Sequence, residues 1–277
     1  MRLRMGPEPT EQNATLAFVD GKAVGFAHTW VGEDDLRAVI RVDPNHQDSG
    51  VAAALLAAVE KRAAENWRTA GRELTPELSV TAGAQDTAAA EFLRETGFVP
   101  VRHFFQMRTP LTSVAADDVR LPPGATLRRF EPGKDDDAIF GAFRESFADH
   151  WGNADPDPGV WWRENRDDPA SGYDPSLWLV IEVAGVIVGF AVSREQEENE
   201  QRIGWVSLVG VAPLSRGLGL GETLLRASLL EFQRRGLAEA ALSVDVDNSS
   251  GALRLYEKIG MTATPAFSVW SKQLLFA

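Results

Sequence analysis

The chain of 277 residues contains the same ordered pattern twice. The stretch VDGKAVGFA at residues 19–27 recurs as VAGVIVGFA at residues 183–191, and each copy reads as two short strands joined by a glycine turn. Further along, FLRETGF at residues 92–98 parallels LYEKIGM at residues 255–261. Because the matches keep one order and nearly one offset, they indicate a duplicated domain, so one architecture has to be used twice.

A third match lies between these two and contains a run of glycines. Residues 40–56 (IRVDPNHQDSGVAAALL) align with residues 210–225 (GVAPLSRGLGLGETLL), and in both copies an apolar strand pattern stops at a proline before a helical pattern. The aligned pairs are Val42 with Val211, Pro44 with Pro213, Gln47 with Arg216, Gly50 with Gly219, and Ala52 with Gly221. Both halves therefore place a loop at the same strand-to-helix junction.

The join between the halves is predicted at residues 112–123, TSVAADDVRLPP, which are polar and end in two prolines. We expect a first domain at residues 1–111 and a second at residues 124–277. Interleaved strand and helix patterns predict an α/β (α+β) fold, with a mixed, mostly antiparallel sheet flanked by helices in each half. The first half has no counterpart of residues 126–168, so we expect a truncated domain or a chain that starts later than its ancestor.

Composition excludes several classes of function. There is no cysteine, which excludes disulfides, thiolate nucleophiles and cysteine metal sites, and no metal is implied. The formal net charge of −12 argues against broad binding of nucleic acid or anionic membranes, although a local anion site is still allowed. No window approaches the ~20 apolar residues of a membrane span, and the first residues lack the apolar core of a secretory signal. We expect a cytoplasmic protein of undetermined oligomeric state.

The loop RGLGLG at residues 216–221 needs a physical reason, because glycine costs backbone entropy and weakens the first turn of a helix. A helix N-terminus carries unpaired N–H groups and partial positive charge, so phosphate binds there readily. Glycines would expose that backbone, and Arg216 would add charge or brace the loop. The spacing fits neither a P-loop, a dinucleotide fingerprint nor a kinase loop. An anion-binding turn and a tight turn without a ligand both remain open.

Two motifs then carry a resemblance to a known family. Residues 211–221, VAPLSRGLGLG, resemble the Gln/Arg-x-x-Gly-x-Gly/Ala motif of the Gcn5-related N-acetyltransferases, the GNAT family. Residues 245–261, DVDNSSGALRLYEKIGM, resemble that family's signature Asn-x-x-x-Ala-x-x-Leu-Tyr-x-x-x-Gly-Phe. The resemblance covers residues 126–274 and, more weakly, residues 15–111. The tandem plan is similar to that of mycothiol synthase-like actinobacterial acetyltransferases.

The resemblance implies that acetyl-CoA is the cosubstrate and that a primary amine of a small molecule attacks its thioester directly. Its pyrophosphate would lie on the loop residues Arg216, Gly217, Leu218, Gly219, Leu220 and Gly221. Its pantetheine arm would pair with Val209, Gly210 and Val211, where the glycine would permit a close approach and the valines equally suit core packing. Tyr256 matches the family's tyrosine and would protonate the leaving thiolate, unless it only packs on the sheet. Asn248 would bond pantetheine or cap the next turn.

The acceptor is expected to bind at residues 146–162, SFADHWGNADPDPGVWW. The candidates are Asp149, His150, Trp151 and Trp162, an acidic and aromatic set that suits a cationic amine. The alternative is that the tryptophans pack in the core and the aspartates solubilise a loop. The general base is not evident, because Trp205 occupies the position of the catalytic glutamate of mycothiol synthase. Glu182 and Glu195 are alternative bases, although each reads more readily as a solvated strand residue.

We expect the first domain, residues 1–111, not to catalyse. Asp48 lies in its loop, where it would repel a phosphate, and Leu93 occupies the tyrosine position. Two other functions remain open for the whole chain. One is mycothiol synthase activity, against which Trp205 and the missing beginning of the first half argue. The other is a non-catalytic acyl-CoA-binding module, against which the intact RGLGLG loop and Tyr256 argue.

Overall fold

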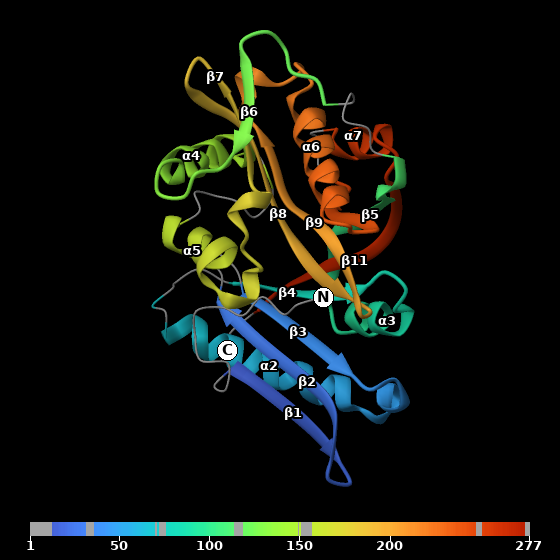
Figure 1. Ribbon diagram of the computed structural model, residues 1–277. Coiled ribbons are helices and arrows are strands. Elements are labelled where there is room, and N and C mark those ends of the chain that lie inside the picture. Colours follow the sequence, from blue (N-terminus) through green and yellow to red (C-terminus); the bar gives the residue numbers. More distant parts are fainter. Residues whose placement is uncertain are drawn as a thin grey trace. The chain divides into compact units, whose positions relative to one another are not determined.

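The computed structural model describes residues 13–31, 36–69, 71, 76–113, 119–148, 150, 157–247 and 251–274 (Figure 1). The chain forms two compact units, each described here by itself. Unit 1 combines the residues up to Phe104 with those from Pro265 onward, and unit 2 is Phe105–Thr264. This division by packing differs from the predicted division by repeats at residues 112–123, which stays a prediction, and residues 114–118 lie outside the described part.

Unit 1 is a mixed sheet with helices. Its strands are β1 (Ala14–Val19), β2 (Lys22–Val31), β3 (Leu36–Val42), β4 (Glu77–Gly83), the start of β5 (Val99–Pro110) and most of β11 (Thr262–Gln273). The order β1-β2-β3-β4-β11 is antiparallel except for the parallel pair β3–β4. Phe267 lies opposite Gly83 and Gln273 opposite Glu77, so the end of the chain completes the unit that its beginning forms.

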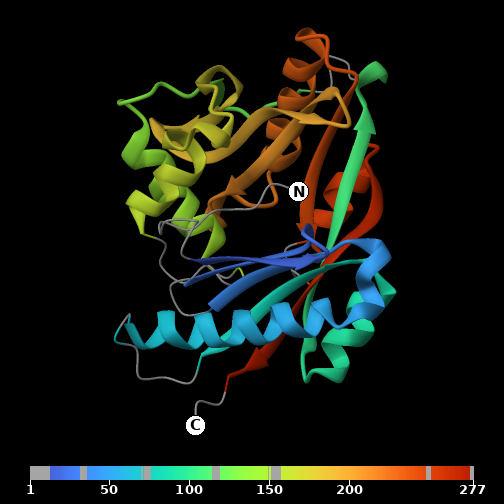
Figure 2. The ribbon, with the colours of Figure 1, turned by 90° about the horizontal axis from the view of Figure 1, so that it is seen from below.

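Helices complete unit 1. They are the 3₁₀ turn η1 (Pro44–Ser49), α2 (Val51–Thr69) and α3 (Thr87–Glu95). Residues four apart on α2 are all buried, namely Val51, Leu55, Val59, Ala63 and Trp67. This spacing puts them on one face of an α-helix, which packs against the sheet in one apolar cluster (Figure 2). Burial of each large side chain contributes about 1.5–3 kcal/mol before entropy is counted.

In unit 2 the strands lie in the order β5-β10-β9-β8-β7-β6. Its strands are β6 (Ala125–Arg129), β7 (Leu179–Val183), β8 (Val186–Glu198), β9 (Gln201–Val211) and β10 (Glu239–Asp245), with the end of β5. β6, β7, β8 and β9 pair antiparallel, whereas β9 and β10 are parallel. The predicted mixed, mostly antiparallel sheet flanked by helices is confirmed.

The helices of unit 2 cover the two faces of its sheet. They are α4 (Asp136–Phe147), α5 (Pro158–Trp162), a π turn at Arg163–Asp167, α6 (Leu220–Arg234) and α7 (Ala252–Lys258), with 3₁₀ turns at Leu111–Ser113, Pro169–Ser171, Pro175–Leu177 and Pro213–Ser215. On one face, α6 buries Leu225, Leu229 and Phe232, whose spacing of i, i+4 and i+7 in the sequence puts them on one side of the helix. On the other, α4 and α5 enclose a cluster that includes Phe143 and Trp161. Along the described part of the chain, no helix is long and apolar enough to cross a membrane.

Candidate active site

The glycine loop of unit 2 presents bare backbone at the beginning of α6. Gly217 and Gly219 have φ of 80° and 78°, the left-handed region that glycine adopts without steric cost. Apart from the adjacent residues, no atom of the described part of the chain lies within 4 Å of where a Cβ of either residue would stand. Gly219 is the N-cap of α6 and contributes no side-chain cap, so the first N–H groups of this 15-residue helix are left for another partner.

The remaining loop residues anchor this arrangement. Leu220 is buried against β7 and β8, whereas Leu218 is 57% exposed. A Cβ on Gly221 would stand 3.4 Å from the side chain of Leu255 on α7, and Lys258 of α7 pairs with Glu222 of α6 at 2.5 Å. The helix that carries the predicted tyrosine is therefore docked against the first turn of α6.

Strand β9 leaves the parallel pairing with β10 before it reaches the loop. The two strands pair from Gly204 opposite Ala240 to Val206 opposite Leu242. The rest of β9, through the predicted residues Val209, Gly210 and Val211, is paired along the other edge by β8. Among the described residues, no strand pairs with the edge of β9 that faces away from β8 over residues 207–211.

The strand also contains a bulge. Val192 of β8 lies opposite Leu208, but Ser193 lies opposite Val206, so Ser207 is an extra residue on β9. Bulges re-aim side chains and are common beside active sites. The sequence reasoning did not single out Ser207, although a serine within the apolar run WVSLVGV was a visible signal.

Ser207 lines a cavity of about 10 Å³, room for one water molecule. Other polar lining residues are Asn165, Ser171, Tyr173, Ser193 and Arg194. Within the described residues, the buried hydroxyls of Tyr173 and Ser193 have no hydrogen-bond partner. The Arg194 guanidinium donates to Ser207 Oγ at 3.1 Å. The cavity is a polar pocket at the bulge, where a buried hydroxyl gains from a bound water or ligand oxygen.

Gly210 has a packing reason that the sequence did not reveal. A Cβ at this position would stand 2.5 Å from the ring of Phe190 and 3.0 Å from Cβ of Ser146. The sequence predicts that a ligand approaches Gly210 closely, but in the structure protein side chains occupy this space. Gly210 therefore does not by itself indicate a ligand. The side chains of Val209 and Val211 pack against buried residues on the α6 side, which leaves their main chain as the part available for pairing.

Arg216 braces the loop in the structure. Its Nε donates to the carbonyl oxygen of Val211 at 3.3 Å, and its Nη2 donates to the carbonyl oxygen of Ser146 at 3.1 Å. Of the two roles that the sequence left open for Arg216, these contacts correspond to the brace.

Tyr256 lies on α7, half-buried against the apolar cluster that contains Leu225 and Leu229. Burial raises the pKa of its phenol from 10 to about 12. The phenol is therefore protonated at neutral pH, as a proton donor must be. Asn248, the other residue of this motif, lies outside the described residues.

Of the predicted acceptor residues, Asp149 and Trp151 lie outside the described part of the chain. His150 follows α4, and its ring meets Phe147 edge-on at 4.5 Å between centroids. Trp162 stacks on Trp178 at 6.2 Å, and the Arg166 guanidinium lies 4.1 Å from the centroid of the Trp162 ring. For Trp162, these contacts match the alternative in which the side chain packs in the core.

The two candidate bases are held in ion pairs. Glu182 accepts from Arg128 at 2.7 Å, and this hydrogen bond lowers the pKa of Glu182 despite some burial. Burial alone would raise the pKa of Glu195, but hydrogen bonds from Arg202 and Arg235 outweigh it and lower that pKa. A carboxylate with a lowered pKa is a weak base, so neither residue suits proton abstraction. Trp205, half-buried, has the Arg194 guanidinium 5.9 Å from its ring centroid.

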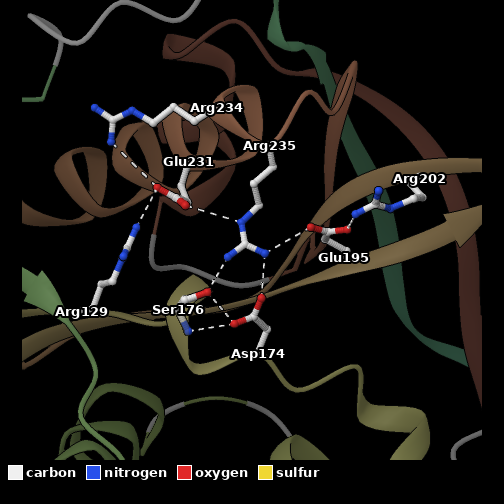
Figure 3. A network of polar contacts seen from close by, with 8 residues as sticks. All are labelled: Arg129, Asp174, Ser176, Glu195, Arg202, Glu231, Arg234 and Arg235. Carbon is white, nitrogen blue, oxygen red and sulfur yellow. Dashed lines mark hydrogen bonds and ion pairs between the residues drawn. The ribbon is translucent and has the colours of Figure 1, made fainter.

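Glu195 belongs to a polar network at the end of α6 (Figure 3). Arg235 donates to Asp174 at 2.6 Å, to Glu195 at 3.2 Å and also to Ser176. Glu231 completes the network through Arg129, Arg234 and Arg235. Asp174 follows Tyr173 and Glu195 follows Arg194, so Arg235 binds the neighbours of two residues that line the polar pocket.

The loop of unit 1 that corresponds to the glycine loop of unit 2 has different residues and a different cap. Gly50 has φ of 77°, and Asp43 caps the 3₁₀ turn by accepting from the N–H of Asn45. Gln47 lines an open depression of about 510 Å³ together with Gly83, Ala84, Gln85, Asp86, Thr87, Ala88 and Ala266. Leu93, at the tyrosine position, is 3% exposed and packs in the core. In neither unit do the described residues include a group of three histidine or acidic side chains able to hold a metal.

Comparison with known proteins supports the two-domain reading. The acetyltransferase (GNAT) family model matches residues 137–261, and a GNAT domain model matches residues 11–100. A mycothiol acetyltransferase of Frankia alni is 34% identical over 252 residues, which cover 86% of this chain and 71% of that protein. A second, of Thermomonospora curvata, is also 34% identical, covering 89% of this chain and 78% of that protein.

Solved structures of GNAT proteins have the same fold as this chain. A GCN5-related N-acetyltransferase from Sphaerobacter thermophilus is 28% identical with a TM-score of 0.81, over 96% of this chain and 82% of that one. A tandem GNAT protein from the clavulanic acid biosynthesis pathway shares the fold, with a TM-score of 0.72 at 17% identity over 95% of this chain and 83% of that one. The chain is an acyltransferase that belongs to the GNAT acetyltransferase family.

Proposed function

We propose that the second domain transfers an acetyl group from acetyl-CoA to a primary amine of a small molecule. The observation that carries this proposal is the bare N-terminus of α6, where Gly217 and Gly219 expose the backbone to open space. N–H groups and the helix dipole there suit the diphosphate of CoA. The residues proposed to hold it with their main chain are Gly217, Leu218, Gly219, Leu220 and Gly221, while the side chain of Arg216 braces the loop as described.

The open edge of β9 supports the placement of the rest of the donor. An arm that leaves the loop and runs back along Val211, Gly210 and Val209 would add to the sheet as an extra strand. Its thioester would then lie near Ser207 and the bulge. Asn248 is proposed to contact the same arm.

The chemistry proposed is direct transfer. The amine nitrogen bonds to the thioester carbon, the carbon–sulfur bond breaks, and the thiolate takes a proton from Tyr256. The high pKa of this phenol keeps its proton available at every physiological pH. The amine must also lose a proton, and the carboxylates of Glu182 and Glu195 are ill suited to receive it. We propose that water passes this proton to the phenolate of Tyr256, which restores the phenol. We propose residues 146–162, including Asp149, His150, Trp151 and Trp162, as the acceptor region.

Native mass spectrometry of the full chain titrated with acetyl-CoA tests the donor site. We expect one bound equivalent, abolished by Gly219→Glu, whose carboxylate would repel the diphosphate. Gly236→Glu is the matched control, because Gly236 also has a left-handed φ of 76° and open space, but lies at the other end of α6. Two equivalents would show that the first domain binds as well, and no binding would refute the proposal.

A second candidate is favoured by the relatives themselves, which are named mycothiol acetyltransferases. It is acetylation of an amino-sugar thiol conjugate by the same site. Trp205, where the resemblance places a glutamate base, argues against it. Comparing the rate on such a conjugate with rates on simple primary amines decides between the two. A non-catalytic acyl-CoA-binding module would instead acetylate none of them.

A further inference from the structure

Arg216 is the only charged side chain within the loop of residues 216–221, and its guanidinium turns back toward the protein. Its Nε–H reaches the last residue of β9, Val211, and its Nη2 reaches Ser146 of α4. The side chain thus joins three elements: the loop, the end of the strand, and a helix on the other side of the sheet.

The hydrogen bond from Arg216 gives a partner to a carbonyl group at the end of α4. Ser146 stands in the last turn of α4, which ends at Phe147, and the last four carbonyl groups of a helix have no partner within it. A cation at this end also complements the negative pole of the helix dipole. The charge of Arg216 is therefore already in use before any anion arrives.

The same turn of α4 packs directly on β9. The Cβ of Ser146 would lie 3.0 Å from a Cβ placed on Gly210, so there is no slack between helix and strand. Ser146 itself is 5% exposed. Close packing transmits a displacement of one element to the other. A displacement of the end of α4 would therefore also move Gly210, the strand residue proposed to pair with the donor arm, and the loop that Arg216 connects to them.

From this geometry we infer that Arg216 is a positioning residue, which ties the donor loop to the helix that leads into the acceptor region, and not a ligand of the donor phosphates. The inference rests on the proposed function for the identity of the two regions. The physical link between them is in the contacts of Arg216. Binding of CoA at the loop then stabilises the last turn of α4, where the chain continues toward His150.

Two measurements on the full chain test this tie: the Kd of CoA by calorimetry at physiological salt, and hydrogen exchange of the amides of residues 143–147 with and without CoA. In Arg216→Gln we expect the Kd of CoA to stay within about threefold. We expect those amides to exchange about fivefold faster, the loss of one ordinary hydrogen bond. CoA slows their exchange in the natural protein and not in the variant.

Arg216→Lys keeps the charge but offers one nitrogen in place of a fork that spans two carbonyl groups. We expect it also to leave residues 143–147 less protected. Arg226→Gln removes a cation from α6 that pairs with Glu222, and it controls for the change in charge. A Kd weakened tenfold or more in Arg216→Gln and restored in Arg216→Lys would overturn the inference and make Arg216 a phosphate ligand. Unchanged exchange at residues 143–147 would overturn it as well.

If the natural protein binds no CoA, the proposed function fails, and the exchange comparison without CoA still decides whether Arg216 holds α4. The two failures are therefore distinguishable.

Discussion

Leu242 of β10 pairs with Val206 of β9, and the parallel pairing of these strands goes no further. Beyond this pair, β9 continues for five residues to Val211 with β8 along one edge. The chain then turns through the glycine loop into α6. Within the described residues, the unpaired part of β9 is therefore followed directly by the N-terminus of α6, and we propose that an extended donor with a diphosphate binds along both.

Replacing Gly210 with alanine is expected to destabilise the protein by about 1–3 kcal/mol, the usual cost of overpacking. The added methyl group would meet the ring of Phe190 at 2.5 Å. Thermal unfolding measures the loss. Phe190→Leu in the same chain should recover part of it, since the smaller side chain leaves room. If Gly210→Ala keeps its stability but loses CoA binding, the close neighbour of this glycine is a ligand and not Phe190.

Replacing Tyr256 with phenylalanine is expected to lower kcat by about 10²–10⁴-fold, because the thiolate loses its proton donor. The Kd of CoA should change little, since the phenol acts only as the carbon–sulfur bond breaks. Steady-state kinetics with calorimetry separate the two quantities. An unchanged kcat would show that Tyr256 only packs against its cluster.

Tyr256 should also lower the stability of the folded protein at high pH. The pKa of Tyr256 is about 12 in the folded protein and about 10 in an unfolded chain. Below pH 10 the phenol is protonated in both states and has no effect. Between pH 10 and about 12 only the unfolded state ionises, so stability falls by about 1.4 kcal/mol per pH unit. Tyr256→Phe should lack this loss, and the difference in Tm between the two proteins, measured from pH 9 to 12, reveals it.

Replacing Arg235 is expected to reduce the stability of the protein, whereas replacing its neighbour Arg234 is expected to change it little. Arg235 is 23% exposed and binds Asp174, Glu195 and Ser176, whereas Arg234 is 64% exposed and meets Glu231 at 3.8 Å. Arg235→Ala should cost about 2–3 kcal/mol, because two partly buried carboxylates lose a partner. Arg234→Ala should stay within about 0.5 kcal/mol. Urea unfolding at neutral pH measures both, and equal losses would contradict the role of the network.

The stabilisation that Arg235 provides should be lost at low pH. Hydrogen bonds with Arg235 help to lower the pKa of Asp174 and of Glu195, against the effect of burial. The two carboxylates stabilise the folded protein fully above about pH 4, their pKa in an unfolded chain. This stabilisation is lost as the pH falls through the lower pKa values that they have in the folded protein. The gap in stability between the natural protein and Arg235→Ala should therefore narrow below pH 4. A gap that is constant from pH 7 to pH 3 would mean that Arg235 contributes by packing alone.

The sequence by itself determined the duplicated plan, the mixed sheets with flanking helices, and the buried stripe of α6 at Leu225, Leu229 and Phe232. It also located the loop at residues 216–221 between a strand and a helix. These features follow from repeats, periodicity and glycine spacing, which are local properties of a chain.

Only the tertiary structure decided which distant residues meet. It placed Phe267–Gln273 beside β4 in unit 1, put the ring of Phe190 over Gly210, and sent Arg216 to Ser146. It also put Ser207 on a bulge, which depends on how β8 and β9 align along their length. Strand register, close packing and long-range hydrogen bonds join segments far apart in the chain, so no local pattern records them.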